Sequence, residues 1–174
     1  MGNKNNDIHF MKKAIHCASI ALEQGNFPVG CVITYQNNII STGSRTSSVG
    51  HSPNELDHAE INALKNLGSQ KEISHLNCNQ LTLYSTLEPC LMCFGAILIH
   101  RIPRIVYAYE DVMGGGTSLD RSDLSPLYAS QDIEIVPGVC RQDSLYLFKD
   151  FFSNPKNNYL SGSYLATYTI QQLN

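Results

Sequence analysis

The sequence lacks a hydrophobic run long enough to cross a membrane. A transmembrane helix needs roughly 18 or more consecutive apolar residues. The longest apolar stretch, Phe94–Ile99, is interrupted by Gly95. Residues 1–7 are polar and contain no apolar segment typical of a secretory signal peptide. These absences predict a cytoplasmic protein without a membrane partner.

An excess of positive charge is also missing. The chain has 12 Lys and Arg against 15 Asp and Glu, a net charge of −3 at pH 7. Its basic residues are scattered, and only Lys12-Lys13 and Arg101 with Arg104 lie close together. Nucleic-acid-binding proteins usually gather Lys and Arg on one face or along one helix. The charge therefore disfavours a nucleic-acid partner, although it leaves room for a local basic patch.

The six cysteines do not indicate a disulfide framework. Without a signal peptide, and with a Cys-x-x-Cys pair beside a helical pattern, we expect free thiols. Four cysteines occur singly in apolar or loop contexts, and we expect them to be buried like small hydrophobic residues: Cys17, Cys31, Cys78 and Cys140. The other two, Cys90 and Cys93, belong to the pair.

The apolar pattern predicts alternating helices and strands in one domain with a single core. We expect helices at about 7–25, with Asp7 as N-cap, 59–68, 90–100 and 140–152, and strands at 29–35, 39–42, 81–86, 105–109 and 133–136. The first two strands should form an antiparallel hairpin. Residues 43–57 form a long polar loop, and the tail beyond Asn154 shows no clear period. Such alternation is typical of an α/β sandwich with a mixed sheet.

Two short segments, His58-Ala59-Glu60 and Pro89-Cys90-Leu91-Met92-Cys93, carry the chemistry. Structural zinc sites are closed by four protein ligands, whereas catalytic sites use three and leave one position for water. We expect His58, Cys90 and Cys93 to bind Zn²⁺. Glu60 is not needed as a ligand, so it could take a proton from the water and return it to a leaving group. The pattern predicts a site that activates water.

The spacing of these residues also predicts local geometry. Residues two apart point to opposite sides of a regular helix, so His58 and Glu60 can share a site only if the helix begins within one or two residues of His58. A position of His58 in the middle of a helix would contradict the shared site. Cys90 and Cys93 lie three apart on one helical turn, where the positive end of the helix dipole favours thiolates.

The segment Leu83–Ile97 (LYSTLEPCLMCFGAI) resembles the cytidine and deoxycytidylate deaminase superfamily. Within it, the segment looks most like the bacterial tRNA adenosine deaminases and their relatives, the guanine and fungal-type cytosine deaminases. Phe27–Gly30 and Arg101–Tyr107 fit this resemblance as well. The resemblance implies a three-layer α/β/α sandwich around a five-stranded mixed sheet and a homodimer. It also implies a deaminase domain at 1–153 and a tail at 154–174 that packs on its own or a neighbouring subunit.

The chain departs from the tRNA enzymes in the loop before His58. Those enzymes carry an Asn that contacts the base where Arg45 stands, and Pro-Thr-Ala where this chain has Glu55-Leu56-Asp57. Arg45 suits a planar or anionic group of the substrate; a solvated loop cation is the alternative. By the same resemblance we expect Val29, Ala59 and Asp111 to contact the substrate, although Asp111 could equally cap the loop that follows it.

Three functions follow, in decreasing order of support. The leading hypothesis is zinc-dependent hydrolytic deamination of an aminated purine or pyrimidine, as a free base or nucleoside, with release of ammonia and a small molecule as the partner. The alternative is a tRNA-specific adenosine-to-inosine deaminase, which the net negative charge disfavours. The third is a non-catalytic zinc module with a deaminase fold. Glu60 argues against this last hypothesis, because a purely structural site has no use for it.

Overall fold

The computed structural model describes residues 4–49, 53–69 and 77–172. Its helices are α1 (Lys4–Glu23), α2 (Ala59–Gly68), α3 (Leu91–Ile99), α4 (Pro126–Ala129), α5 (Arg141–Ser153) and α6 (Tyr164–Gln171), with a short 3₁₀ helix at Cys78–Gln80. Its strands are β1 (Gly30–Tyr35), β2 (Asn38–Ser44), β3 (Leu81–Leu87), β4 (Arg104–Tyr109) and β5 (Glu134–Val136). In this part of the chain, no helix combines the length and apolar character that crossing a membrane requires.

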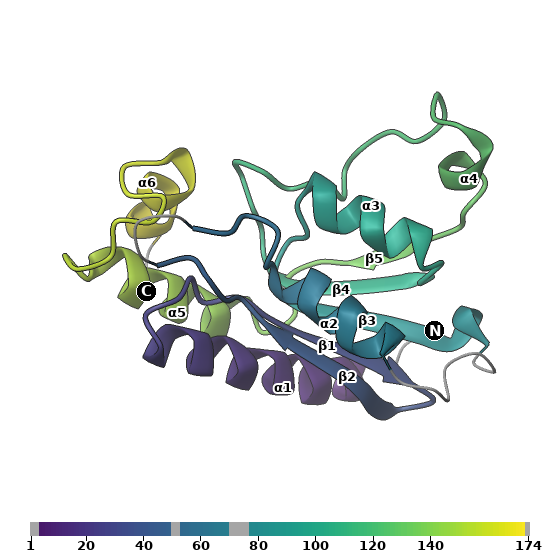
Figure 1. Cartoon of the computed structure of the whole chain (residues 1–174), viewed down its shortest axis with the longest axis horizontal. Coiled ribbons are helices and arrows are strands. Elements are labelled where there is room, and N and C mark those ends of the chain that lie inside the picture. The colour runs from purple at the N-terminus through teal and green to yellow at the C-terminus, as the bar shows by residue number, and fades with distance from the viewer. Residues whose placement is uncertain (1–3, 50–52, 70–76, 173–174) are drawn as a thin grey trace.

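The five strands form one sheet in the order β2-β1-β3-β4-β5. Strand β1 runs antiparallel to both β2 and β3, so the predicted hairpin is present. The β3–β4 and β4–β5 pairs are parallel. Helices α1 and α5 lie against one face of the sheet, while α2 and α3 lie on the other (Figure 1). The predicted three-layer sandwich with a five-stranded mixed sheet is therefore confirmed.

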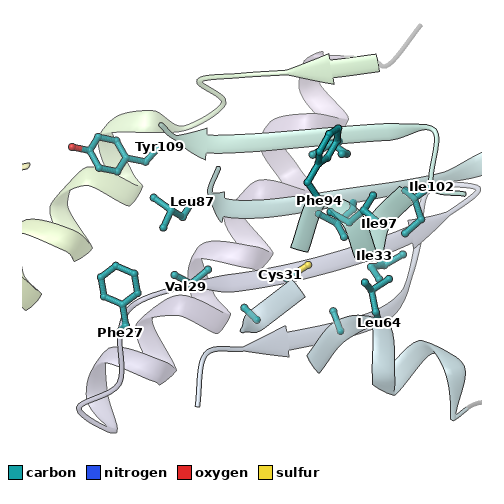
Figure 2. Close-up of a cluster of buried hydrophobic side chains, with 14 of the residues drawn as sticks. Phe27, Val29, Cys31, Ile33, Leu64, Leu87, Phe94, Ile97, Ile102 and Tyr109 are labelled. Carbon is teal, nitrogen blue, oxygen red and sulfur yellow. The ribbon is translucent and has the colours of Figure 1, made fainter. Parts of the chain in front are cut away.

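The core sits on both faces of the sheet because side chains alternate along each strand. Cys31 and Ile33 of β1 are buried in the larger cluster with Leu64 of α2 and with Phe94 and Ile97 of α3 (Figure 2). On the opposite face, Val32, Tyr84 and Val106 pack against Phe10, Met11 and Ala14 of α1. Full burial of one large apolar side chain contributes about 1.5–3 kcal/mol, so the larger cluster holds α2 and α3 on one face of the sheet and the smaller one holds α1 on the other.

The prediction that Asp7 caps the first helix is wrong. Helix α1 already includes Lys4, and the Asp7 side chain is buried inside the fold. Its carboxylate accepts hydrogen bonds from Arg104 Nη1 at 2.7 Å and Nη2 at 2.9 Å, and from the Tyr84 hydroxyl at 3.1 Å. A buried charge needs such partners. Asp7 therefore joins α1 to β3 and β4 instead of starting the helix.

The tail and the single cysteines also differ from expectation. Residues 164–171 form a helix whose N-cap, Ser163, accepts a hydrogen bond from Ala166 N at 3.1 Å. Eight residues are too few to show an apolar period in the sequence. None of the six cysteines, all in the described part of the chain, forms a disulfide, but of the four single ones only Cys31 is buried. Cys78 is exposed, so its prediction as a buried residue is wrong.

Gly43 allows α2 to lie directly on β2. A Cβ atom at this position would stand 2.1 Å from the Ala59 carbonyl oxygen and 2.5 Å from Ala63 N. Both distances are far below van der Waals contact, and both involve backbone atoms that cannot rotate away. The first turn of α2, which follows His58, is therefore positioned by the missing side chain of Gly43.

We expect Gly43→Ala to lower the free energy of unfolding by about 1–3 kcal/mol, the usual cost of overpacking a core. Urea titration followed by circular dichroism measures the change. Gly95→Ala is the matched control, because a Cβ there meets no atom within 4 Å. Since Ala is the better helix former, this control should gain about 0.5–1 kcal/mol. Equal stabilities of the two variants would contradict the close approach.

Candidate metal centre and active site

His58 is the N-cap of α2, and the helix begins at the next residue. The backbone of His58 is extended, with φ −66° and ψ 150°. Its side chain is therefore free of helical periodicity, and it reaches the same side as Glu60, two residues later. The predicted helix start is confirmed, and with it the geometric condition for a shared site.

The two cysteines approach His58 from the start of α3. Cys90 is the N-cap of α3, and Cys93 lies in its first turn, fully buried. His58 Nδ1 lies 3.6 Å from Cys90 Sγ and 3.5 Å from Cys93 Sγ. One ligand atom from each of the three residues lies within 4.8 Å of the others. The motif halves, thirty residues apart in the sequence, meet in one cluster.

This cluster fits a zinc ion. Tetrahedral zinc binds His nitrogen at about 2.0 Å and Cys sulfur at about 2.3 Å, so a nitrogen and a sulfur ligand lie about 3.6 Å apart. Both nitrogen–sulfur distances, 3.6 and 3.5 Å, agree with that spacing. Two thiolates and one imidazole are also a typical zinc donor set. The residues can therefore hold Zn²⁺ with one coordination position left over.

The charges in the cluster also favour a cation. A hydrogen bond from Cys93 lowers the pKa of Cys90 to about 4 against the effect of burial, and His58 assists. The same hydrogen bond, together with burial, raises the pKa of Cys93. Burial lowers the pKa of His58, but the hydrogen bond with Cys90 and the charge of Glu60 outweigh it and raise the pKa. A lowered pKa favours the thiolate of Cys90, which is the form that binds a metal ion.

Glu60 lies beside the cluster as a buried carboxylate, with only 3% of its surface exposed. Its Oε1 accepts a hydrogen bond from the Ser85 hydroxyl at 2.8 Å, and its Oε2 accepts one from Cys93 Sγ at 3.5 Å. Burial raises the pKa of Glu60, although its backbone N–H, His58 and Ser85 oppose the shift. A carboxyl group with a raised pKa in an enclosed site is suited to accepting and returning protons.

A cavity of about 190 Å³ opens beside this centre. His58, Glu60 and Cys90 line it together with the four residues that the sequence predicts as substrate contacts, Val29, Arg45, Ala59 and Asp111. The described structure thus brings these residues into one wall. Further lining residues come from the loops before β1 and α2, from the end of β3 and the residue after it, from the loop after β4 and from the tail: Phe27, Glu55, Leu87, Glu88, Met113, Gly114, Tyr159, Leu160 and Leu165.

Arg45 departs from one of its two expected alternatives, whereas Asp111 meets both. Only 2% of Arg45 is exposed, so it is not a solvated loop cation. Asp111 lines the cavity and also caps its loop, because its Oδ1 accepts from Met113 N at 3.0 Å and Gly114 N at 2.9 Å. For Asp111 the two alternatives therefore coexist in one side chain.

Sequence reasoning missed several residues of the site. Glu88 holds the loop after β4 beside Cys90, because its carboxylate accepts hydrogen bonds from Asp111 N at 3.3 Å and from Thr117 N at 3.3 Å. Glu88 could have been found from the sequence, because it directly precedes Pro89 of the metal-binding motif. Ser85 could have been found from strand alternation, since it shares a face with Leu83. The lining residues Leu160 and Leu165 had no such signal, because the tail shows no period.

Comparisons with known proteins give the family. Residues 4–109 match the family described as the cytidine and deoxycytidylate deaminase zinc-binding region. A tRNA-specific adenosine deaminase from Buchnera aphidicola subsp. Schizaphis graminum is 40% identical over 157 residues, which cover 87% of this chain and 97% of that protein. One from Buchnera aphidicola subsp. Baizongia pistaciae is 44% identical over 103 residues, which cover 59% of this chain and 61% of that protein.

A solved structure gives the same result. It comes from biochemical and structural studies of A-to-I editing by tRNA deaminases at the wobble position of transfer RNA. The similarity has a TM-score of 0.67 at 28% identity and covers 80% of this chain and 98% of the other. The fold, the His-Cys-Cys cluster and these matches define a zinc-dependent hydrolase that acts on C–N bonds. The chain belongs to the cytidine and deoxycytidylate deaminase family.

The expected partner is wrong. We expected a small-molecule base or nucleoside, with tRNA disfavoured, but the relatives that cover most of this chain are tRNA-specific adenosine deaminases. The same relatives support the alternative function better than the deamination of free bases or nucleosides. The error has a physical cause: net charge sums the whole surface, whereas recognition depends on the residues around one cavity.

We expect purified protein to contain about one zinc ion per chain, since a catalytic zinc site needs three protein ligands. Cys90→Ser removes one of them and should lower the zinc content by at least tenfold after dialysis, as measured by inductively coupled plasma mass spectrometry. Cys78→Ser, at an exposed thiol outside the cluster, should leave it unchanged. Zinc retained at full occupancy in Cys90→Ser would rule out the assigned ligand set.

Proposed function

We propose that this protein is a tRNA-specific adenosine deaminase that converts an adenosine of tRNA to inosine at the wobble position. One observation carries the proposal: the 40% identity to a deaminase of this name extends over 97% of that protein. The match therefore extends well beyond the zinc-binding motif. The solved structure with a TM-score of 0.67, from studies of wobble editing, supports the same substrate.

The shape of the site supports a base that leaves its stack. Glu60 is buried, and the cavity beside it is lined by residues from five separate parts of the chain. A deaminase cannot reach an amino group inside stacked bases, so the target nucleotide must be turned outward into the pocket. Phe27, Val29 and Leu87 offer apolar contacts for a planar ring. An anticodon loop presents such unstacked bases.

In this proposal, His58, Cys90 and Cys93 hold the zinc ion. When bound, zinc supplies Lewis-acid chemistry and lowers the pKa of water toward 7. The starts of α2 and α3 fix the three side chains before the metal arrives. Cys93 is fully buried, whereas His58 and Cys90 line the cavity, so the cavity gives water access to the centre.

Glu60 moves the protons. Its Oε1 is fixed by Ser85, and its carboxylate can take a proton from the attacking water and give it to the amino group at C6 of adenine. A C6–O bond forms, the C6–N bond breaks, and ammonia leaves. Water supplies the oxygen and the protons, so the products are inosine and ammonia. The reaction requires no oxidant or further reactant.

Two earlier expectations remain predictions. A cytoplasmic location agrees with tRNA as substrate, and its test is fractionation of cells that express the tagged protein. The division into a domain at 1–153 and a tail at 154–174 stays a prediction as well, although Tyr159, Leu160 and Leu165 of the tail line the cavity.

The experiment that tests the function is a deamination assay on a synthetic anticodon stem-loop with adenosine at the wobble position. We expect inosine in the product, detected by mass spectrometry of nuclease digests, and weaker binding as salt rises, because phosphate contacts release counterions. A stem-loop with adenosine moved elsewhere in the loop is the control. Ammonia release from free nucleosides alone, with no inosine in the stem-loop, would refute the proposal.

We expect Glu60→Gln to keep its zinc and its affinity for the stem-loop but to lose about 100- to 10,000-fold in kcat, the usual contribution of general acid–base catalysis. Gln has nearly the same shape as Glu but cannot accept the proton. Single-turnover assays with measured zinc content check this result. Glu23→Gln at the end of α1 is the control. Near-normal turnover by Glu60→Gln would remove Glu60 from the mechanism.

A further inference from the structure

Arg45 is a buried cation with incomplete hydrogen bonding. It lies in the cavity wall with His58 and Glu60, and only 2% of it is exposed. Its Nη2 donates to Glu55 Oε2 at 3.0 Å and to the Tyr159 hydroxyl oxygen at 3.1 Å. Its Nε and Nη1 are buried without any partner. They are the only buried side-chain nitrogen or oxygen atoms without a partner in the described part of the chain.

Such unpartnered donors need an explanation, because a buried N–H without an acceptor costs free energy. Arg45 cannot turn away to find water, since three contacts hold it. Its backbone N–H donates to the Val29 carbonyl at 2.8 Å, its Nη2 is bound by Glu55, and its guanidinium lies 5.4 Å from the centre of the Tyr159 ring. The structure therefore holds a fixed cation whose remaining donors have no acceptor among the described residues.

A ligand bound in the cavity can supply the acceptors that Arg45 lacks. Glu55 compensates the charge of Arg45 only partly, since 62% of the Glu55 side chain is exposed to water. The Tyr159 hydroxyl donates to Glu55 at 2.7 Å, so both groups are already engaged with each other. A planar ligand that enters between Phe27, Val29 and the metal centre brings ring nitrogens and ribose oxygens close to this wall. Guanidinium groups suit planar acceptors of this kind.

We propose that Arg45 is a specificity-determining residue that donates hydrogen bonds from its free nitrogens to acceptor atoms of the target nucleoside. The inference rests on the proposed function and adds the group that recognises the base or its ribose after it has entered the cavity. Glu55 and Tyr159 are then positioning residues, because they bind the guanidinium and fix its orientation.

The experiment couples protein variants to altered substrates. Wild type and Arg45→Met are compared on the wobble stem-loop with adenosine, 7-deazaadenosine, 3-deazaadenosine or 2′-deoxyadenosine at the target position. Each analogue removes one acceptor, so the arms separate the two edges of the base from the ribose. With adenosine, Arg45→Met should lose about 10- to 100-fold in kcat/KM, as expected for a lost charged hydrogen bond.

For wild type, one analogue should be a poorer substrate than adenosine. Arg45→Met should turn over that analogue and adenosine at the same rate, because the variant lacks the guanidinium that binds the acceptor atom missing from the analogue. Arg45→Lys keeps the positive charge but not the planar guanidinium, so its kcat/KM with adenosine should lie between those of wild type and Arg45→Met. If Arg45→Met does not fold, Arg45→Lys replaces it in the same comparison. The proposal would be overturned if each of the three analogues lowered kcat/KM by the same factor in wild type and in Arg45→Met.

Tyr159→Phe is the matched control for a merely structural role. It removes the hydroxyl but keeps the ring under the guanidinium. A structural Arg45 predicts that both variants lower the melting temperature and reduce turnover of every substrate by the same factor. The failures are distinguishable: no inosine from wild type refutes the proposed function, whereas wild-type turnover without coupling refutes only the role of Arg45.

Discussion

Two helix starts converge on one point, and the rest of the site depends on this convergence. The N-termini of α2 and α3 bring His58 and Cys90 within 3.6 Å of each other. Both helices present the positive ends of their dipoles there, which alone would be unfavourable. The lowered pKa of Cys90 favours a thiolate there, which supplies compensating negative charge. Anionic side chains are therefore favourable at the meeting point, and thiolates and carboxylates are the groups that bind a metal cation or move protons.

The parts of this site that were predictable from sequence depend on local rules. The two-residue spacing of His58 and Glu60 required a helix boundary, and the structure has one. The alternation of helical and strand segments along the chain predicted the mixed sheet. The contacts that sequence reasoning missed join distant segments. Asp7 pairs with Arg104, and Tyr159 with Glu55, across 97 and 104 residues respectively. No local pattern encodes such pairings.

The substrate was misjudged for a related reason. A net charge of −3 is a property of the whole chain, and it carries no information about where individual charges lie. Arg45 illustrates the point, because its charge is hidden in the cavity wall and contributes almost nothing to the outer surface. Long-range attraction of RNA and short-range recognition of one base are separate physical problems. Only the first is approximated by counting Lys and Arg.

The tail shapes the cavity from outside the region that defines the family. The family match ends at residue 109, whereas Tyr159, Leu160 and Leu165 form part of the cavity wall. Part of the cavity wall is thus encoded in a different stretch of the chain from the residues of the metal centre. Substitutions in the tail can remodel the space without disturbing a metal ligand or the proton carrier. The fold thereby allows selectivity to diverge while the reaction is inherited unchanged.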